Sequence, residues 1–126
     1  MSKERNSFDL EDRLIDFAVR IIRIAEALPK TRVGNHINGQ IVRCGTSPAP
    51  NYGEAQGAES RADFIHKMKI CLKELRETKV WLLMIGKANL IKTTSKLDSL
   101  IDENNQLISI FVISIKTAKD KKDKTS

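Results

Sequence analysis

The amino-acid sequence predicts an all-α protein, a four-helix bundle whose second helix is kinked or broken near Pro48 and Pro50. Apolar residues recur at steps of three and four along almost the whole chain, which is the spacing of one helix face. Only 5% of the residues are aromatic although 40% are hydrophobic, and such an aliphatic core suits helix packing. We expect one domain over residues 1–118, followed by a basic, polar and disordered tail over residues 119–126.

The first helix is expected from about Asp9 to Leu28. Acidic residues crowd its first turn, where they meet the positive end of the helix dipole, and Pro29 ends its regular hydrogen bonding. Phe17, Ile22 and Ile24 widen its core-facing stripe. That stripe consists of Leu14, Ala18, Ile21, Ala25 and Leu28.

The second helix is weaker and is expected from about Arg32 to Cys44. Pro48 and Pro50 follow it, and each proline lacks the amide that would bond four residues back. We therefore expect a kink or a full break at this point, with the helix resuming around residues 52–56.

A third helix is expected to open at Ser60, which with Asp63 resembles a capping box, and to reach about Ile85. Gly86 is the expected C-cap of this helix. Its core seam alternates steps of four and three, as a packed helix requires, and consists of Phe64, Met68, Cys71, Leu75, Thr78, Leu82 and Ile85.

A fourth helix is expected to start at Ser95 as N-cap and to run to about Ile115. It carries two adjacent apolar stripes, one of Leu97, Leu100, Leu107 and Phe111 and one of Ile101, Ile108, Val112 and Ile115. Ile110 and Ile113 lie outside both stripes. The segments 80–85 and 107–115 are apolar nearly all round, so we expect homo-oligomerisation to cover their outer faces. The alternative is that loops or the kinked helix cover them within one monomer.

Composition and charge favour a cytoplasmic protein with acidic partners. The formal net charge is +6, which attracts anions but leaves nucleic acid only a candidate. The first residues are polar, and no apolar run reaches the roughly 20 residues that a membrane span needs. Cys44 and Cys71 fit a reducing compartment, since Cys71 falls within the apolar seam.

No catalytic motif is found, so we expect a protein that is not an enzyme and holds no cofactor or metal. His36 and His66 lie on different expected helices without a second ligand at metal-binding spacing. Glu74 and Glu77 border the core seam and need partners if buried. Arg43 is a possible partner, and simple solvent exposure is the alternative.

Basic residues recur at helical spacing along the third helix, and they form the candidate nucleic-acid surface. They are Lys69, Lys73 and Arg76, with Lys67 and Lys79 nearby. Most such runs are only the solvated face of a helix. In a symmetric oligomer, however, the run repeats around the axis and can grip phosphates. Few aromatic residues are available for base stacking, which favours structured or duplex nucleic acid over single strands.

Several segments together resemble a known bacterial family of four-helix bundles, related to the 23S rRNA intervening-sequence proteins. They are residues 27–34, Arg43 to Ser47, Asn51-Tyr52, Glu54-Ala55, Glu59 to Ile65, Lys73 to Thr78 and Trp81-Leu82. The resemblance implies an up-and-down, left-handed bundle that commonly assembles as a ring-shaped homopentamer. For most members no activity is established, and distant relatives that serve retroelements are basic pentamers associated with nucleic acid.

The chain departs from the family pattern at the bend, where Pro48-Ala49-Pro50 replaces a helix-compatible Val-Gly-Ala and Gly53 replaces an arginine. We expect structural or oligomer-forming roles for the residues that match the pattern or lie on the apolar outer surface. They are Asn51, Tyr52, Glu54, Glu74, Glu77, Trp81, Ile110 and Ile113. The leading hypothesis is a ring oligomer, a pentamer by resemblance, that binds nucleic acid or a nucleic-acid-binding protein. The alternative is a protein-interaction scaffold without nucleic-acid binding.

Overall fold

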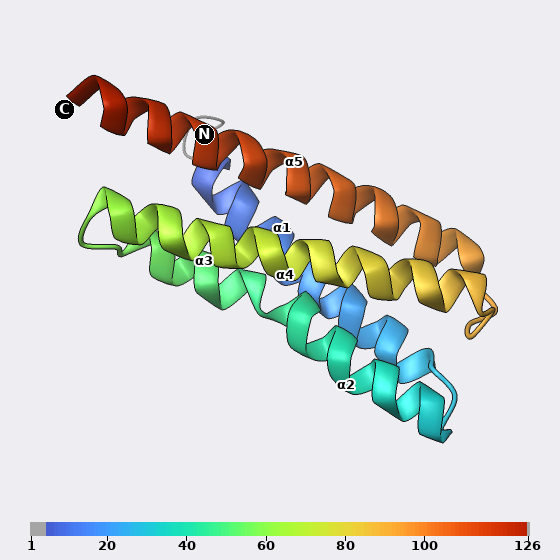
Figure 1. Ribbon diagram of the computed structural model, residues 1–126. Coiled ribbons are helices and arrows are strands. Elements are labelled where there is room, and N and C mark those ends of the chain that lie inside the picture. Colours follow the sequence, from blue (N-terminus) through green and yellow to red (C-terminus); the bar gives the residue numbers. More distant parts are fainter. Residues whose placement is uncertain (1–4, 126) are drawn as a thin grey trace.

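The fold is all-α, as the sequence predicts (Figure 1). The computed structural model describes residues 5–125, and side-chain environments for residues 10–121. Its helices are α1 (Arg5–Ala27), α2 (Arg32–Thr46), α3 (Pro48–Gln56), α4 (Arg61–Lys87) and α5 (Thr94–Thr125). No strand occurs among the described residues.

The five helices occupy the four corners of a bundle, because α2 and α3 follow one another along a single bent corner (Figure 1). Both α1 and α4 pack against α2, α3 and α5, but α1 and α4 do not pack against each other over the described residues. They therefore stand at diagonal corners, and their outer faces look to opposite sides of the molecule. This arrangement confirms the predicted four-helix bundle.

The predicted break after α2 is a bend at Ser47, but the expected restart at residue 52 is wrong. The helix resumes at Pro48, because prolines in the first turn of a helix lose no hydrogen bond that the turn would otherwise make. The amide of Asn51 already donates to the Ser47 carbonyl at 3.2 Å. The bend brings Gly45 so close to α1 that an added Cβ would lie 2.7 Å from Cγ2 of Ile21.

The predicted N-terminus of α4 is confirmed, while two other helix ends differ from expectation. The Ser60 hydroxyl accepts from the Asp63 amide at 3.0 Å. Gly86 is not the C-cap of α4, since the helix continues to Lys87 and the chain turns at Asn89, whose φ is 53°. Ser95 is not the N-cap of α5, because α5 already begins at Thr94.

At its other end, α5 continues to Thr125, beyond the expected end at Ile115. The proposed division into a bundle over residues 1–118 and a disordered tail over residues 119–126 stays a prediction.

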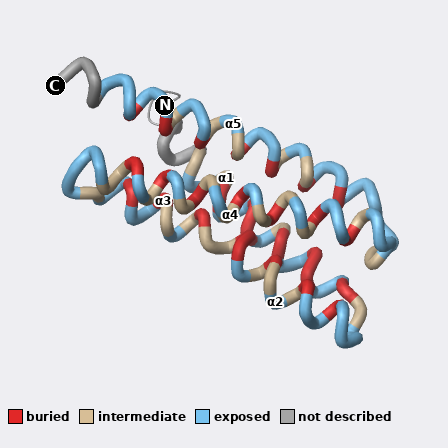
Figure 2. The backbone as a smooth tube through the Cα atoms, viewed as in Figure 1, coloured by how far each residue is buried: buried red, intermediate tan, exposed pale blue. Residues whose placement is uncertain are grey.

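The core lies where the stripes predict it, and buried residues face inward along every corner (Figure 2). All members of the α4 seam are buried except Phe64, which is half-buried. Two polar side chains also lie in the core. Thr78 donates its hydroxyl to the Glu74 carbonyl at 2.7 Å, whereas Asn104 is 0% exposed and neither its amide nitrogen nor its oxygen has a partner among the described residues.

Candidate nucleic-acid and subunit interfaces

Five exposed cations lie on one side of the α4–α5 pair, and we call them the basic ridge. They are Lys69, Lys73 and Arg76 of α4 and Lys116 and Lys119 of α5. The helical spacing of each set keeps its members on one face. The three α4 residues were predicted as a candidate surface, while the two α5 lysines were expected in a frayed segment and were missed.

Lys69 and Lys119 approach each other across the two helices of the basic ridge. The nearby Lys119 ammonium lowers the pKa of Lys69 from its usual value, first by charge repulsion and then through a hydrogen bond between the two amines. Two like charges held at this distance disfavour each other. A bound anion between them would relieve that repulsion.

The two remaining predicted cations lie apart from the basic ridge. Lys67 pairs with Glu54 of α3 at 2.7 Å, which raises the pKa of the lysine and ties α3 to α4. Lys79 is half-buried and lines a hollow between α4 and α5 together with Arg76 and Leu83. The structure therefore brings three of the five predicted cations together and gives Lys67 a different neighbour.

Glu74 and Glu77 take part in an ion-pair network between α2 and α4. Arg43 donates to Oε1 of Glu74 at 3.0 Å and to Oε2 of Glu77. Trp81 donates its indole N–H to the same Glu77 oxygen at 3.0 Å. The indole bond and then the guanidinium lower the pKa of Glu77, and the Glu77 bond raises the pKa of Arg43. The network links two helices and leaves no carboxylate placed for proton transfer.

The family-matching residues at the bend lie within the bundle or join its helices. Tyr52 is buried and meets Phe111 of α5 edge-on, with ring centroids 6.0 Å apart. Asn51 donates its side-chain amide to the Ser47 carbonyl and hydroxyl, at 3.0 and 2.9 Å, and so spans the bend. These positions suit structural roles.

An exposed apolar stripe runs along the outer face of α1, and we call it the α1 stripe. It consists of Ile15, Val19 and Ile22, of which Ile15 is 47% exposed. The expectation that Ile22 widens the core is therefore wrong. The acidic residues Glu11, Asp12, Asp16 and Glu26 lie around the stripe and are exposed. Their recurrence opposite the core stripe was a signal that sequence reasoning overlooked.

A second exposed apolar area lies on α4 and the start of α2, and we call it the α4 patch. It consists of Val33, Val80, Leu83 and Met84, and Val80 is 50% exposed. Cationic residues border it, namely Arg76, Lys79 and Lys87. The α1 stripe and the α4 patch thus lie on opposite sides of the molecule and carry borders of opposite charge.

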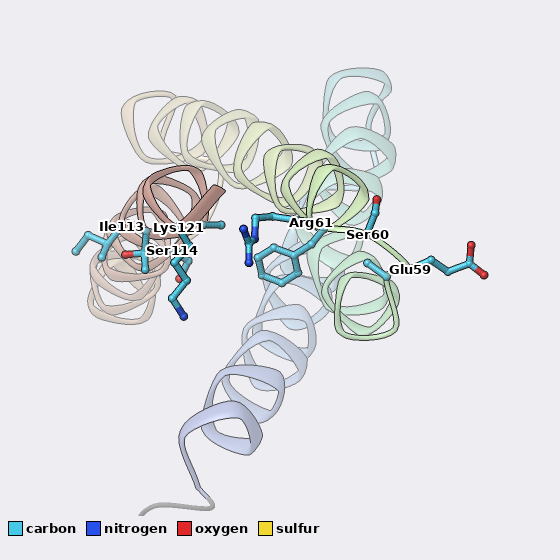
Figure 3. Close-up of a pocket in the computed structure, with 10 residues that line it drawn as sticks. Glu59, Ser60, Arg61, Ile113, Ser114 and Lys121 are labelled. Atoms are coloured by element: carbon cyan, nitrogen blue, oxygen red, sulfur yellow. The ribbon is translucent and has the colours of Figure 1, made fainter. Parts of the chain in front are cut away.

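Ile113, predicted as an outer apolar residue, is 64% exposed, whereas Ile110 is half-buried. Ile113 lines a hollow of about 620 Å³ between α5 and the start of α4. Arg61 reaches across this hollow toward Ser114 and Lys121, while Glu59 and Ser60 point away from it (Figure 3). Arg61 and Lys121 each interact with further groups, so the hollow does not present unoccupied cations.

The described residues contain no group of three or more histidine, cysteine or carboxylate side chains that could hold a metal ion. Burial raises the pKa of Cys71 to about 12, so this thiol is not an activated nucleophile. Within the same part of the chain, none of the helices combines the length and apolar character of a membrane span.

Comparison with known proteins gives a family without an established activity. A family model described as 23S rRNA-intervening sequence protein matches residues 7–112. A solved structure of a protein with unknown function from the S23 ribosomal protein family of Bacteroides thetaiotaomicron is also similar, with 34% sequence identity and a TM-score of 0.78. The similarity covers 85% of this chain and 98% of that one. A comparison with curated proteins finds no match.

Proposed function

Since the chain belongs to the 23S rRNA-intervening sequence protein family, we propose that it is a non-enzymatic cytoplasmic protein that assembles head to tail into a ring and binds structured nucleic acid. The family's name does not supply this function. The proposal rests on the two apolar faces and on the basic ridge.

The assembly follows from the position and chemistry of the two faces. The α1 stripe and the α4 patch differ from each other, so contact between them in two copies leaves one free face of each kind. Such a heterologous contact repeats until it closes into a ring or extends into a filament. Carboxylates around the α1 stripe would meet Arg76, Lys79 and Lys87 around the α4 patch of the next copy. Five copies is the number that the family resemblance implies.

The approach of Lys69 and Lys119 is the observation that carries the nucleic-acid part of the proposal. Most surface lysines reduce their mutual repulsion by spreading into solvent or by pairing with acids, as Lys67 does with Glu54. A ridge that holds its cations together favours a ligand with closely spaced negative charges. Repeated around a ring, this ridge would meet successive phosphates of a duplex, with affinity that falls steeply as salt rises.

The test is binding of a duplex RNA by fluorescence anisotropy at several salt concentrations. Reversing Lys69, Lys73 and Lys119 to Glu should weaken binding at least tenfold and flatten the salt dependence by about one unit of slope per lost phosphate contact. Arg76 is left unchanged because it borders the α4 patch. The matched control reverses Lys30, Arg32 and Lys92, which are exposed and lie off the ridge. Equal losses in both triple variants would contradict a specific role of the ridge.

The alternative function is a scaffold whose α4 patch takes an apolar helix from a partner protein. It is favoured by two hollows of about 530 and 590 Å³ that flank Val80 and Leu83. Salt distinguishes the two functions, because docking of an apolar helix responds little to ionic strength. A protein that binds no duplex RNA at low salt, yet carries an unmasked α4 patch, would support the scaffold.

A further inference from the structure

A groove between α1 and the start of α5 combines an apolar floor with a cationic border, and neither the ring contact nor the basic ridge uses it. We call it the α1/α5 groove. It consists of two hollows of about 400 and 480 Å³ that share Ile24 and Lys96. Each is within the size range of small-molecule sites.

The floor of the groove is apolar and firmly held. Ile24 and Leu100 belong to the bundle core. Ala27, Leu90 and Ile91 continue the apolar surface into the second hollow. An extended hydrocarbon segment lying along this floor would be removed from water without any polar group of the floor losing hydration.

The border of the groove is positively charged. Arg20, Arg23, Lys92 and Lys96 line the two hollows, and no carboxylate does. Arg20 is positioned by donating to the Ser99 hydroxyl at 2.9 Å, while the other three cations are exposed. Ser95 and Thr93 add hydroxyl groups at the same rim. Cations gathered beside an apolar surface, without acids to neutralise them, match one kind of ligand.

We propose that the α1/α5 groove binds a small amphiphilic anion, a single-chain carboxylate whose head meets Arg20, Arg23 and Lys96 and whose hydrocarbon tail lies over Ile24 and Leu90. The head gains charge-assisted hydrogen bonds from the guanidinium groups. The tail gains affinity from apolar burial in proportion to its length. The groove faces α5, away from the α1 stripe, so ligand binding and ring assembly involve different sides of α1.

The experiment is calorimetric titration of the full chain with dodecanoate below its micelle concentration. Octanoate tests the tail, and the neutral dodecyl glucoside tests the head. We expect dodecanoate to bind at least tenfold more tightly than either. Equal binding of dodecanoate and the neutral glucoside, or no binding of dodecanoate, would overturn the proposal.

Two variants locate the site on the protein. Arg23→Gln with Lys96→Gln should weaken dodecanoate binding at least tenfold, and Thr93→Glu, which adds a carboxylate to the rim, should abolish it. The matched control, Lys73→Gln with Lys87→Gln, removes the same charge from exposed positions outside the groove and should leave the affinity unchanged. An equal loss in the control would overturn the assignment to the groove. All of these positions are exposed, so the fold should survive, and circular dichroism checks that it does.

Discussion

Trp81 donates its indole N–H to Oε2 of Glu77 at 3.0 Å, and Arg43 of α2 binds the same carboxylate oxygen. Both residues stabilise the ionised form of Glu77. The network therefore makes the packing of α2 on α4 sensitive to acid.

The first prediction concerns pH. Because the folded-state pKa of Glu77 is lowered relative to an unfolded value of about 4.3, its contribution to stability is fully present above that unfolded value. The contribution is lost as the pH falls through the folded pKa. Glu77→Gln should be less stable than wild type at pH 7 and should lose less stability on acidification, as measured by thermal midpoints. Glu59→Gln, at an exposed loop position, is the control, and identical acid slopes for wild type and Glu77→Gln would contradict the account.

The second prediction concerns the buried amide of Asn104, which has no partner among the described residues. Asn104→Leu should raise the free energy of unfolding by about 1–3 kcal/mol, because an unsatisfied polar group in the core is replaced by an apolar one of similar size. Urea unfolding measures the change. Asn105→Leu, at the exposed neighbouring position, should change stability little. A clear destabilisation by Asn104→Leu would mean that the amide has a partner, such as a buried water.

The third prediction tests the register of α4. Leu82 is 0% exposed and its neighbour Leu83 lies on the outer face. Leu82→Ala should cost about 2–5 kcal/mol, because it removes buried methyl groups and leaves a cavity. Leu83→Ala should cost much less in a monomer. Similar urea midpoints for the two variants would refute this register.

The fourth prediction concerns the close approach at the bend. A Cβ at residue 45 would lie within 2.8 Å of both γ carbons of Ile21, so Gly45→Ala should destabilise the bundle by about 1–3 kcal/mol through overpacking. Gly53 has open space around the same position, and Gly53→Ala should stabilise α3 by about 0.5–1 kcal/mol. Thermal unfolding of both variants checks the contrast. A tolerated Gly45→Ala would show that Ile21 can move aside.

The sequence was sufficient to predict the helices and the core, because both follow from local periodicity. The α4 seam and the α1 core stripe were read from steps of three and four, and their residues are buried apart from Phe64. The restart at Pro48 was missed because the cost of proline depends on its position within a turn.

The candidate surfaces were harder to predict, because they depend on which helices are neighbours. The meeting of Lys69 with Lys119 requires the α4–α5 pairing. The diagonal placement of α1 and α4 requires the whole packing order. Asn104 was overlooked because helical spacing places a residue in the core without showing whether a polar group there finds a partner.

The central claim is the head-to-tail contact, and native mass by light scattering tests it most directly. Val19→Asp spoils only the α1 stripe and Leu83→Asp only the α4 patch, so each variant alone should be a monomer while the wild type is a closed oligomer. An equimolar mixture of the two variants should form a dimer and nothing larger, because it contains one intact pair of faces. A monomeric wild type, or a mixture that stays monomeric, would contradict the account.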